Sequence, residues 1–193
     1  MATTMVWRRS YSRDEVKELL ASIEDLARKA IEAGERAQRE MAADRFSTYL
    51  DFRRKVEELR AVTALTEERL SGLDENMVRD LKIEFERLDL LMSGLVIRTM
   101  KNYFGSIRDD QVLPIGAREL FEPELAVLEE MRAKFTRPQF AEQMLESAVA
   151  DIDATEAMVR KLTARAPSLP DFSDSPSPSR PTKRLAQLGR PLR

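Results

Sequence analysis

The sequence contains no cysteine and no histidine among its 193 residues. The absence of cysteine excludes disulfide bonds and thiolate chemistry, and it is compatible with the cytoplasmic location that we expect. The absence of histidine removes the commonest general base near neutral pH and the commonest ligand of transition metals. These two absences argue against the most frequent kinds of catalytic and metal site.

Phosphate loops and long apolar runs are also missing. The six glycines form neither a G-x-G-x-x-G nor a G-K-[ST] motif, so no glycine-rich loop cradles a phosphate group. A membrane-spanning helix needs about 20 apolar residues. The most apolar stretch, Leu88–Ile97, is half that length and contains Asp89, so we interpret it as a buried core helix. The residues after Arg8 and Arg9 are polar, which argues against a signal peptide.

Acidic residues do not form a recognisable metal site either. The segment Asp151–Glu156 has the acidic character of a calcium loop, but it lacks the required glycine and terminal glutamate and lies in a helical pattern. A magnesium site built from carboxylates alone needs few ligands and is left open, although no pair of acids stands out. We therefore expect no enzyme activity, no cofactor, no metal and no small-molecule substrate.

What the sequence does contain is typical of long helices. Charged residues make up 34% of the chain and aromatic residues only 6%, and we predict an all-α protein. The segment from Ser12 to Leu70 has no proline and one glycine, Gly34. A single helix over residues 12–71 would be about 88 Å long. That length favours reach, partner binding or assembly as the task of the protein.

This segment carries a coiled-coil pattern. Ser12 and Glu15 form a capping box at its start. Apolar residues then recur three and four apart, with an alanine-rich register shift between two halves. A bend near Gly34 or a break near Asp44 is the alternative to one continuous helix. We expect the second half to join the core and the first half to project toward a partner. The candidate interaction residues of the seam are Leu19, Ile23, Leu26, Phe52, Val56 and Leu59.

Residues 74–166 predict a helical hairpin or small bundle against which the long helix packs. The helix that starts at Asp74 is apolar around much of its circumference, so we expect it at the centre of the fold. Gly94 within it is expected to permit a close helix crossing, a tolerated defect being the alternative. The following connector contains Val112, Leu113 and Ile115. We expect these three to pack on the bundle, with docking of a partner as the alternative.

The two ends of the chain differ from its body. We expect residues 1–11 to be flexible and residues 167–193, which hold six of the nine prolines, to be disordered. The tail has five basic and two acidic residues. Part of it matches the proline-plus-basic pattern that aromatic grooves recognise as a polyproline helix, although a purely solubilising tail is the alternative. The residues of this candidate motif are Pro178, Arg180, Pro181, Lys183 and Arg184.

Two functions are consistent with these patterns. The leading hypothesis is a non-enzymatic assembly or adaptor protein that pairs helices with a second copy or with a helical partner. The alternative is a peripheral binder of anionic membranes or nucleic acid, in which the basic tail and the segment Trp7–Arg13 make the contact. The net charge of −2 excludes a globally basic nucleic-acid binder but not such a local basic patch.

Overall fold

The computed structural model describes residues 12–41, 43, 46–141 and 146–170. These residues form helices and their connections, without a strand, which confirms the all-α prediction. Residues 1–11 and 171–193 lie outside the described part, as do the flexibility and disorder expected of them. The helices are α1 (Arg13–Met41), α2 (Ser47–Ser71), α3 (Glu75–Gly105), α4 (Ala117–Phe121), α5 (Pro123–Phe135), α6 (Pro138–Ala141) and α7 (Glu146–Arg165).

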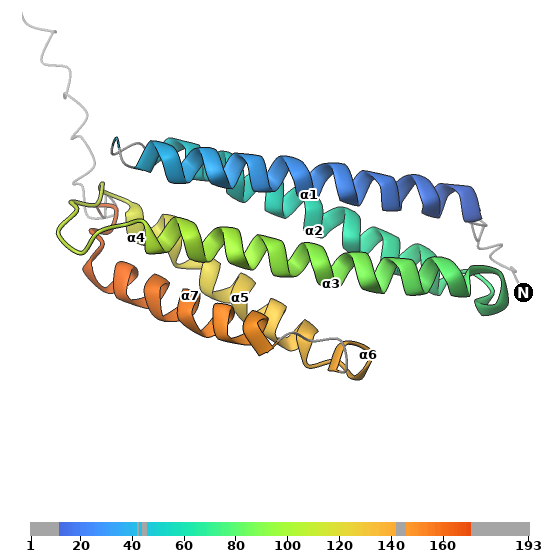
Figure 1. The fold of residues 1–193 in the computed structure, drawn as a ribbon. Helices are drawn as coiled ribbons and strands as arrows, with labels where there is room; N and C mark the ends of the chain where they lie inside the picture. Colours follow the sequence, from blue (N-terminus) through green and yellow to red (C-terminus); the bar gives the residue numbers. More distant parts are fainter. Residues whose placement is uncertain (1–11, 42, 44–45, 142–145, 171–193) are drawn as a thin grey trace, which may run out of the picture.

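The segment expected to form one long helix forms two antiparallel helices (Figure 1). Helix α1 ends at Met41 and α2 begins at Ser47, so the continuous rod is wrong and the alternative of a break near Asp44 is right. The physical reason is burial, because folding back places the apolar stripe of α1 against α2 and α3. Helix α1 is therefore part of the core and not a projecting arm.

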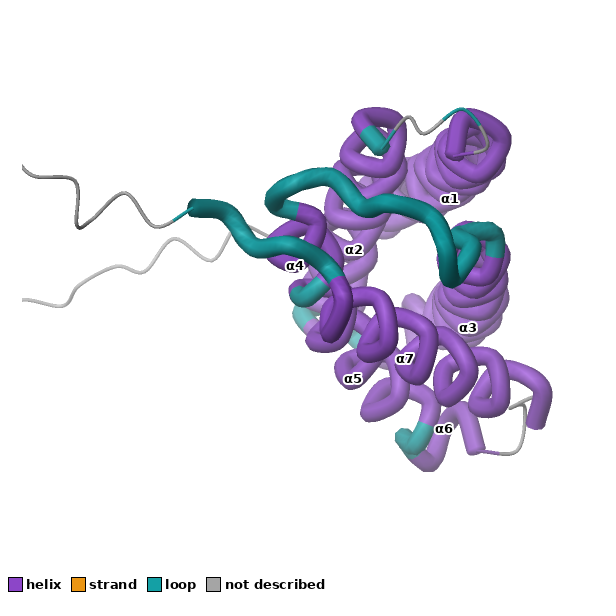
Figure 2. The backbone as a smooth tube through the Cα atoms, turned by 90° about the vertical axis from the view of Figure 1, so that its left-hand side faces the viewer, coloured by secondary structure: helices purple, strands orange, loops and turns teal. Residues whose placement is uncertain are grey.

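The long helices form two layers. Helices α1, α2 and α3 pack together, and α3 also packs against α7, which pairs with α5 (Figures 1 and 2). Helices α1, α3 and α7 run in one direction, and α2 and α5 run in the other. Helix α3 is thus the element shared by both layers, as its broad apolar surface predicts.

Helix starts follow the local sequence signals. The capping box is formed, since the Glu15 amide donates to Ser12 Oγ at 3.2 Å and the Ser12 amide donates to Glu15 Oε2 at 2.9 Å. Asp74 caps α3 by accepting a 2.9 Å hydrogen bond from the Asn76 amide. Pro123 occupies the first turn of α5, where its missing amide proton is not needed.

An aromatic cluster joins the two layers near one end of the bundle. The rings of Tyr49 on α2 and Tyr103 on α3 are stacked with centroids 4.4 Å apart. Phe104 meets Phe121 of α4 edge to face at 5.4 Å. Such pairs contribute about 0.5–1.5 kcal/mol beyond the area they bury. Tyr103 and Phe104 are therefore core residues that join α3 to its neighbours.

The connector between α3 and α4 divides its apolar residues between core and surface. Leu113 is buried, as expected, and Gln111 Nε2 donates to the Met41 carbonyl oxygen at 3.3 Å. Val112 and Ile115 are exposed, so the expectation that they pack on the bundle is wrong. A short connector that crosses the bundle end has only one side facing the core (Figure 2).

The close helix crossing is made at Gly34, while Gly94 is the tolerated defect. A Cβ atom on Gly34 would overlap the Thr99 methyl group and lie 3.0 Å from Phe52 Cδ2, so α1 approaches both neighbouring helices here. The corresponding position on Gly94 has open space around it. The expectation that Gly94 permits a close crossing is therefore wrong.

These two glycines give a matched test of the packing. We expect Gly34→Ala to lower the free energy of unfolding by about 1–3 kcal/mol, because overpacking outweighs the gain in helix propensity. Gly94→Ala should raise it by about 0.5–1 kcal/mol, since the new methyl group meets no neighbour. Urea unfolding of both variants measures the difference. A Gly34→Ala protein as stable as Gly94→Ala would contradict the close crossing.

Candidate interaction site

The predicted seam residues lie in the core of their own chain. Ile23, Phe52, Val56 and Leu59 are buried in one hydrophobic cluster. Leu19 and Leu26 are half-buried. A partner would reach Ile23 and Phe52 only if the helices separated. Val56 and Leu59 also line a cavity, so two of the four buried seam residues can belong to a surface that a partner reaches. The tail candidates Pro178, Arg180, Pro181, Lys183 and Arg184 lie outside the described residues.

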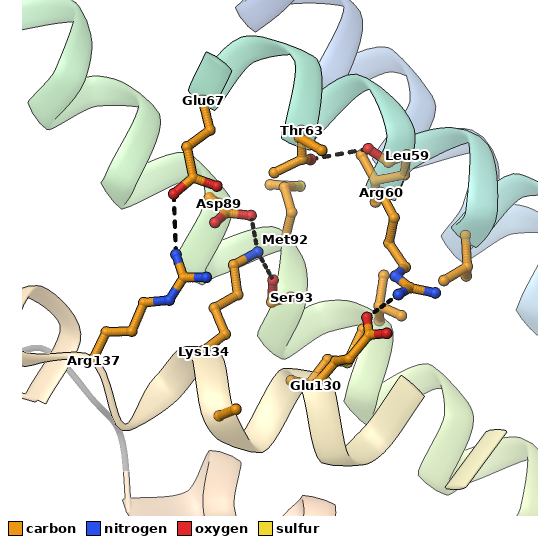
Figure 3. Close-up of a pocket in the computed structure, with 15 residues that line it drawn as sticks. Leu59, Arg60, Thr63, Glu67, Asp89, Met92, Ser93, Glu130, Lys134 and Arg137 are labelled. Atoms are coloured by element: carbon orange, nitrogen blue, oxygen red, sulfur yellow. Dashed lines mark hydrogen bonds and ion pairs between the residues drawn. The ribbon is translucent and has the colours of Figure 1, made fainter. Parts of the chain in front are cut away.

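Such a surface lies between α2 and α5, which flank a gap in the bundle. No Cα atom of α2 comes within 8 Å of one in α5, although both helices are fully described. A cavity of about 440 Å³ lies between them and α3 (Figure 3). We call this cavity the α2–α5 slot. Its apolar lining consists mainly of Val56, Leu59, Met92, Val96 and Met131.

The slot continues toward the turn between α2 and α3. A second cavity, of about 590 Å³, is lined by Leu70, Phe85 and Phe140 and shares Glu67 and Asp89 with the slot. Both volumes fall in the range of about 300–1,000 Å³ that is usual for binding pockets. The two cavities together give an elongated site along α2 and α3.

Three ion pairs cross the gap between α2 and the α5–α6 segment, and we call them the ion-pair ladder. Arg60 of the central pair is 37% exposed and its partner Glu130 63%. Water and salt screen this pair and the similarly exposed pair of Glu67 with Arg137, and each of the two contributes about 0–1 kcal/mol to stability. These two pairs therefore hold the helices together only weakly, whereas Glu124 of the third pair is buried. Its pairs are Arg53 with Glu124, Arg60 with Glu130, and Glu67 with Arg137.

A buried ion pair lies at the back of the slot. Lys134 Nζ donates to Asp89 Oδ1 and, at 3.3 Å, to Ser93 Oγ (Figure 3). Only 7% of the Asp89 side chain is exposed. Burial raises the pKa of Asp89, and the nearby Lys134 ammonium opposes that shift. The pair thus joins α3 to α5 with both charges largely removed from water.

A second buried acid, Glu124, lies beside two tyrosines at the other end of the ladder. Its Oε1 is 3.5 Å from Arg53 Nε and receives no hydrogen bond from the described residues. The hydroxyl groups of Tyr49 and Tyr103 are buried and likewise have no hydrogen-bond partner among those residues. Burial raises the pKa of Glu124, and Arg53 opposes the shift. The negative charge of ionised Glu124 is therefore poorly compensated by hydrogen bonds and by the Arg53 guanidinium.

Sequence reasoning missed both buried acids. In the sequence, Asp89 is a charge that interrupts the most apolar stretch of the chain. That interruption was the available signal, because a charge inside a buried helix requires a partner. Glu124 follows Pro123 and has the pattern of an ordinary acid in a first helical turn. Nothing in that local pattern indicates its burial.

The fold and the slot together define the class of the protein as an all-α helical bundle with a gap in its packing. Comparison with known protein families, with curated proteins and with solved structures finds no match to this chain. No helix in the described ranges is both long and apolar enough to cross a membrane. Those ranges also contain no group of three or more acidic side chains arranged to hold a metal ion.

Because the Lys134–Asp89 pair is buried, we expect Lys134→Ala to destabilise the fold strongly. We expect a loss of about 3 kcal/mol in the free energy of unfolding, because Asp89 would keep a buried charge without a partner. The loss should shrink as the pH falls and Asp89 becomes neutral. The control is Lys161→Ala, which removes an exposed pair with Asp109 and should cost much less. Equal losses in the two variants would contradict the burial of the pair.

Glu124 predicts a pH dependence of stability. Its pKa is higher in the folded chain than its ordinary value of 4.5. Its stabilising contribution is therefore fully present below about pH 4.5 and is lost as the pH rises through the folded-state pKa. Glu124→Gln should thus gain stability relative to the wild type between pH 4.5 and 7, as measured by urea unfolding. The exposed neighbour Glu122 supplies the control, Glu122→Gln, and an equal gain in that variant would contradict burial of Glu124 as the cause.

Proposed function

We propose that the protein is a non-enzymatic helical adaptor that receives an amphipathic helix of a partner in the α2–α5 slot. One observation carries the proposal: α2 and α5 flank a cavity with an apolar lining, and no Cα atom of one helix lies within 8 Å of a Cα atom of the other. An amphipathic helix that lays its apolar face into a groove between helices is a common mode of recognition. The absence of histidine and cysteine supports a non-enzymatic role and permits a cytosolic location.

The charges at the rim of the slot indicate what kind of helix fits. Arg60 and Glu67 lie seven residues apart on α2, and Glu130 and Arg137 have the same spacing on the opposite side. Seven residues is the repeat at which flanking charges pair in coiled coils. A helix with acidic and basic residues at this spacing can replace each ladder pair with a new one. The weak pairs then open at little cost in free energy.

A second copy of the chain meets the same requirement, because its own α2 carries the matching charges. Self-association is therefore one form of the proposal, and a different helical protein is the other. Sedimentation of the purified chain at tens of micromolar distinguishes them. A compact monomer under those conditions would exclude a second copy as the partner. The partner would then be a helix of a different protein.

The slot is tested by closing it with a covalent link. In Arg60→Cys/Glu130→Cys, a short bis-maleimide joins α2 to α5 across the slot, and the natural sequence adds no competing thiol. We expect this link to abolish capture of the partner from a native extract. The matched control, Arg36→Cys/Asp51→Cys, replaces an ion pair of 3.8 Å between α1 and α2 and leaves the slot open.

The captured protein also has to be located on the chain. A photo-reactive residue in place of Met92, which lines the slot, should cross-link to a helical segment of the partner. The same residue in place of the exposed Met77 should not. Equal capture of the partner by the two covalently linked variants would refute the slot as the binding site. Cross-links from position 77 alone would refute it as well.

A further inference from the structure

The ladder pair at the start of α5 differs from the other two pairs because its acid is buried. Only 5% of the Glu124 side chain is exposed, whereas 57% of the Glu57 side chain is. Arg53 is 26% exposed and contacts both acids, with its Nε 3.3 Å from Glu57 Oε1 and 3.5 Å from Glu124 Oε1. The buried carboxyl group is therefore in contact with a side chain that water already reaches.

The charge of an ionised Glu124 is balanced only in part. The Arg53 guanidinium is shared with other acceptors, since its Nη1 also donates to the Leu120 carbonyl oxygen at 3.4 Å. The hydroxyl groups of Tyr49 on α2 and Tyr103 on α3 have no hydrogen-bond partner in the described ranges, so neither donates to Glu124. A buried ion pair whose hydrogen bonds are incomplete does not recover the cost of removing its charges from water. The buried position therefore favours the neutral carboxyl group.

Other charged groups on the surrounding helices do not reverse this balance. On α2, Glu57 raises the pKa of the buried acid and Arg60 lowers it. On α4, Arg118 donates to a carbonyl oxygen near the end of α7, and Glu119 accepts from a backbone amide after α7. At the end of α7, Arg165 donates to carbonyl oxygens of the connector before α4. Arg53 is therefore the main positive charge that acts on the buried acid.

Helix α5 can move relative to α2 without losing its main packing. It packs on α7, and α7 packs on α3, whereas no Cα atom of α5 lies within 8 Å of one in α2. The end of α7 is tied to α4, because the Gly116 amide donates to the Pro167 carbonyl oxygen at 3.2 Å. A small displacement of α5 away from α2 would therefore admit water to Glu124 while the contacts of α7 remain.

We propose that the protonation state of Glu124 controls the width of the α2–α5 slot. A neutral carboxyl group stays buried and keeps α5 close to α2, whereas an ionised carboxylate takes up water as α5 moves away. A proton that binds one of two conformations more tightly shifts the population toward that conformation. The slot is thus open to a partner helix at higher pH and closes on acidification. The biological role of this control rests on the proposed function, but the opening itself needs no partner.

The direction of the pH dependence follows from burial. In the closed form, burial raises the pKa of Glu124 above its ordinary value of 4.5, and Arg53 opposes the shift. In the open form, water surrounds the carboxylate and the pKa returns toward 4.5. The closed form therefore loses stability relative to the open form as the pH rises through the pKa of the closed form. Protonation of the exposed Glu67 and Glu130 would weaken the ladder and so act in the opposite direction.

The test measures the width of the slot in the full chain without a partner. Spin labels at Ala64→Cys and Ala133→Cys, two exposed positions that line the slot on α2 and α5, report their separation by pulsed electron paramagnetic resonance. From pH 5 to pH 8 we expect a shift to longer distances, with the ratio of open to closed chain rising by up to about tenfold per pH unit. A control pair between α1 and α2, Glu24→Cys with Ala64→Cys, should show no shift.

Two further measurements assign the effect to Glu124. Glu124→Gln keeps the size of the side chain but cannot ionise, so the slot should stay narrow at every pH. The control variant, Glu122→Gln, should open as the wild type does. Carbon-13 NMR of the Glu124 carboxyl group in the wild type should show the same titration midpoint as the opening. Circular dichroism checks that every variant is folded.

Three results would overturn the proposal. The first is a slot width that does not change with pH or that increases as the pH falls, which would show that the ion pairs alone hold the slot closed. The second is opening that persists in Glu124→Gln, which would assign it to another acid such as Asp89. The third is an opening midpoint that differs from the titration of Glu124.

These outcomes are distinct from those of the capture experiments. A slot that opens with pH but captures no helical partner would refute the adaptor function and leave the control by Glu124 intact. A slot that captures a partner without pH-dependent opening would refute only the control by Glu124.

Discussion

The close approach of α1 to α2 and α3 is the contact on which the other features of the fold depend. Ala30, Ala33 and Ala37 are almost fully buried on α1, and Gly34 lies among them against Thr99 and Phe52. Alanine buries little area by itself, but small side chains allow helix axes to come closer than larger ones do. The alanine-rich stretch of α1 is therefore a closely packed seam with α2 and α3.

That seam determines where the bundle is open. Because α1 occupies one side of α2 and α3, the α5–α7 pair reaches the layer mainly through α3. Helix α2 is left with an apolar side that no helix backbone covers, and long charged side chains span the distance to α5.

Local signals in the sequence predicted local structure well. The capping box at Ser12, the cap at Asp74 and the start of α5 at Pro123 are all formed, because each depends on neighbours within three residues. The segment between Met41 and Ser47 contains neither glycine nor proline, so the sequence offered the break near Asp44 only as an alternative to one continuous helix.

Tertiary relations could not be predicted in the same way. A heptad stripe is identical whether it packs within one chain or between two, which is why the seam residues suggested a partner. Gly34 and Gly94 are both helix-interior glycines in the sequence, and only the neighbouring helix distinguishes them. The burial of Asp89 and Glu124 likewise arises from segments far away in the chain. The slot depends on the spacing of α2 and α5, which no local pattern encodes.

The hydrogen bond between the Gly116 amide and the Pro167 carbonyl group has a topological consequence. It brings together the two ends of a segment of about fifty residues that contains α4 to α7, so this segment forms a nearly closed ring. A segment whose ends already meet can be viewed as an insertable module, since its removal or transplantation leaves a gap of only a few ångströms to join.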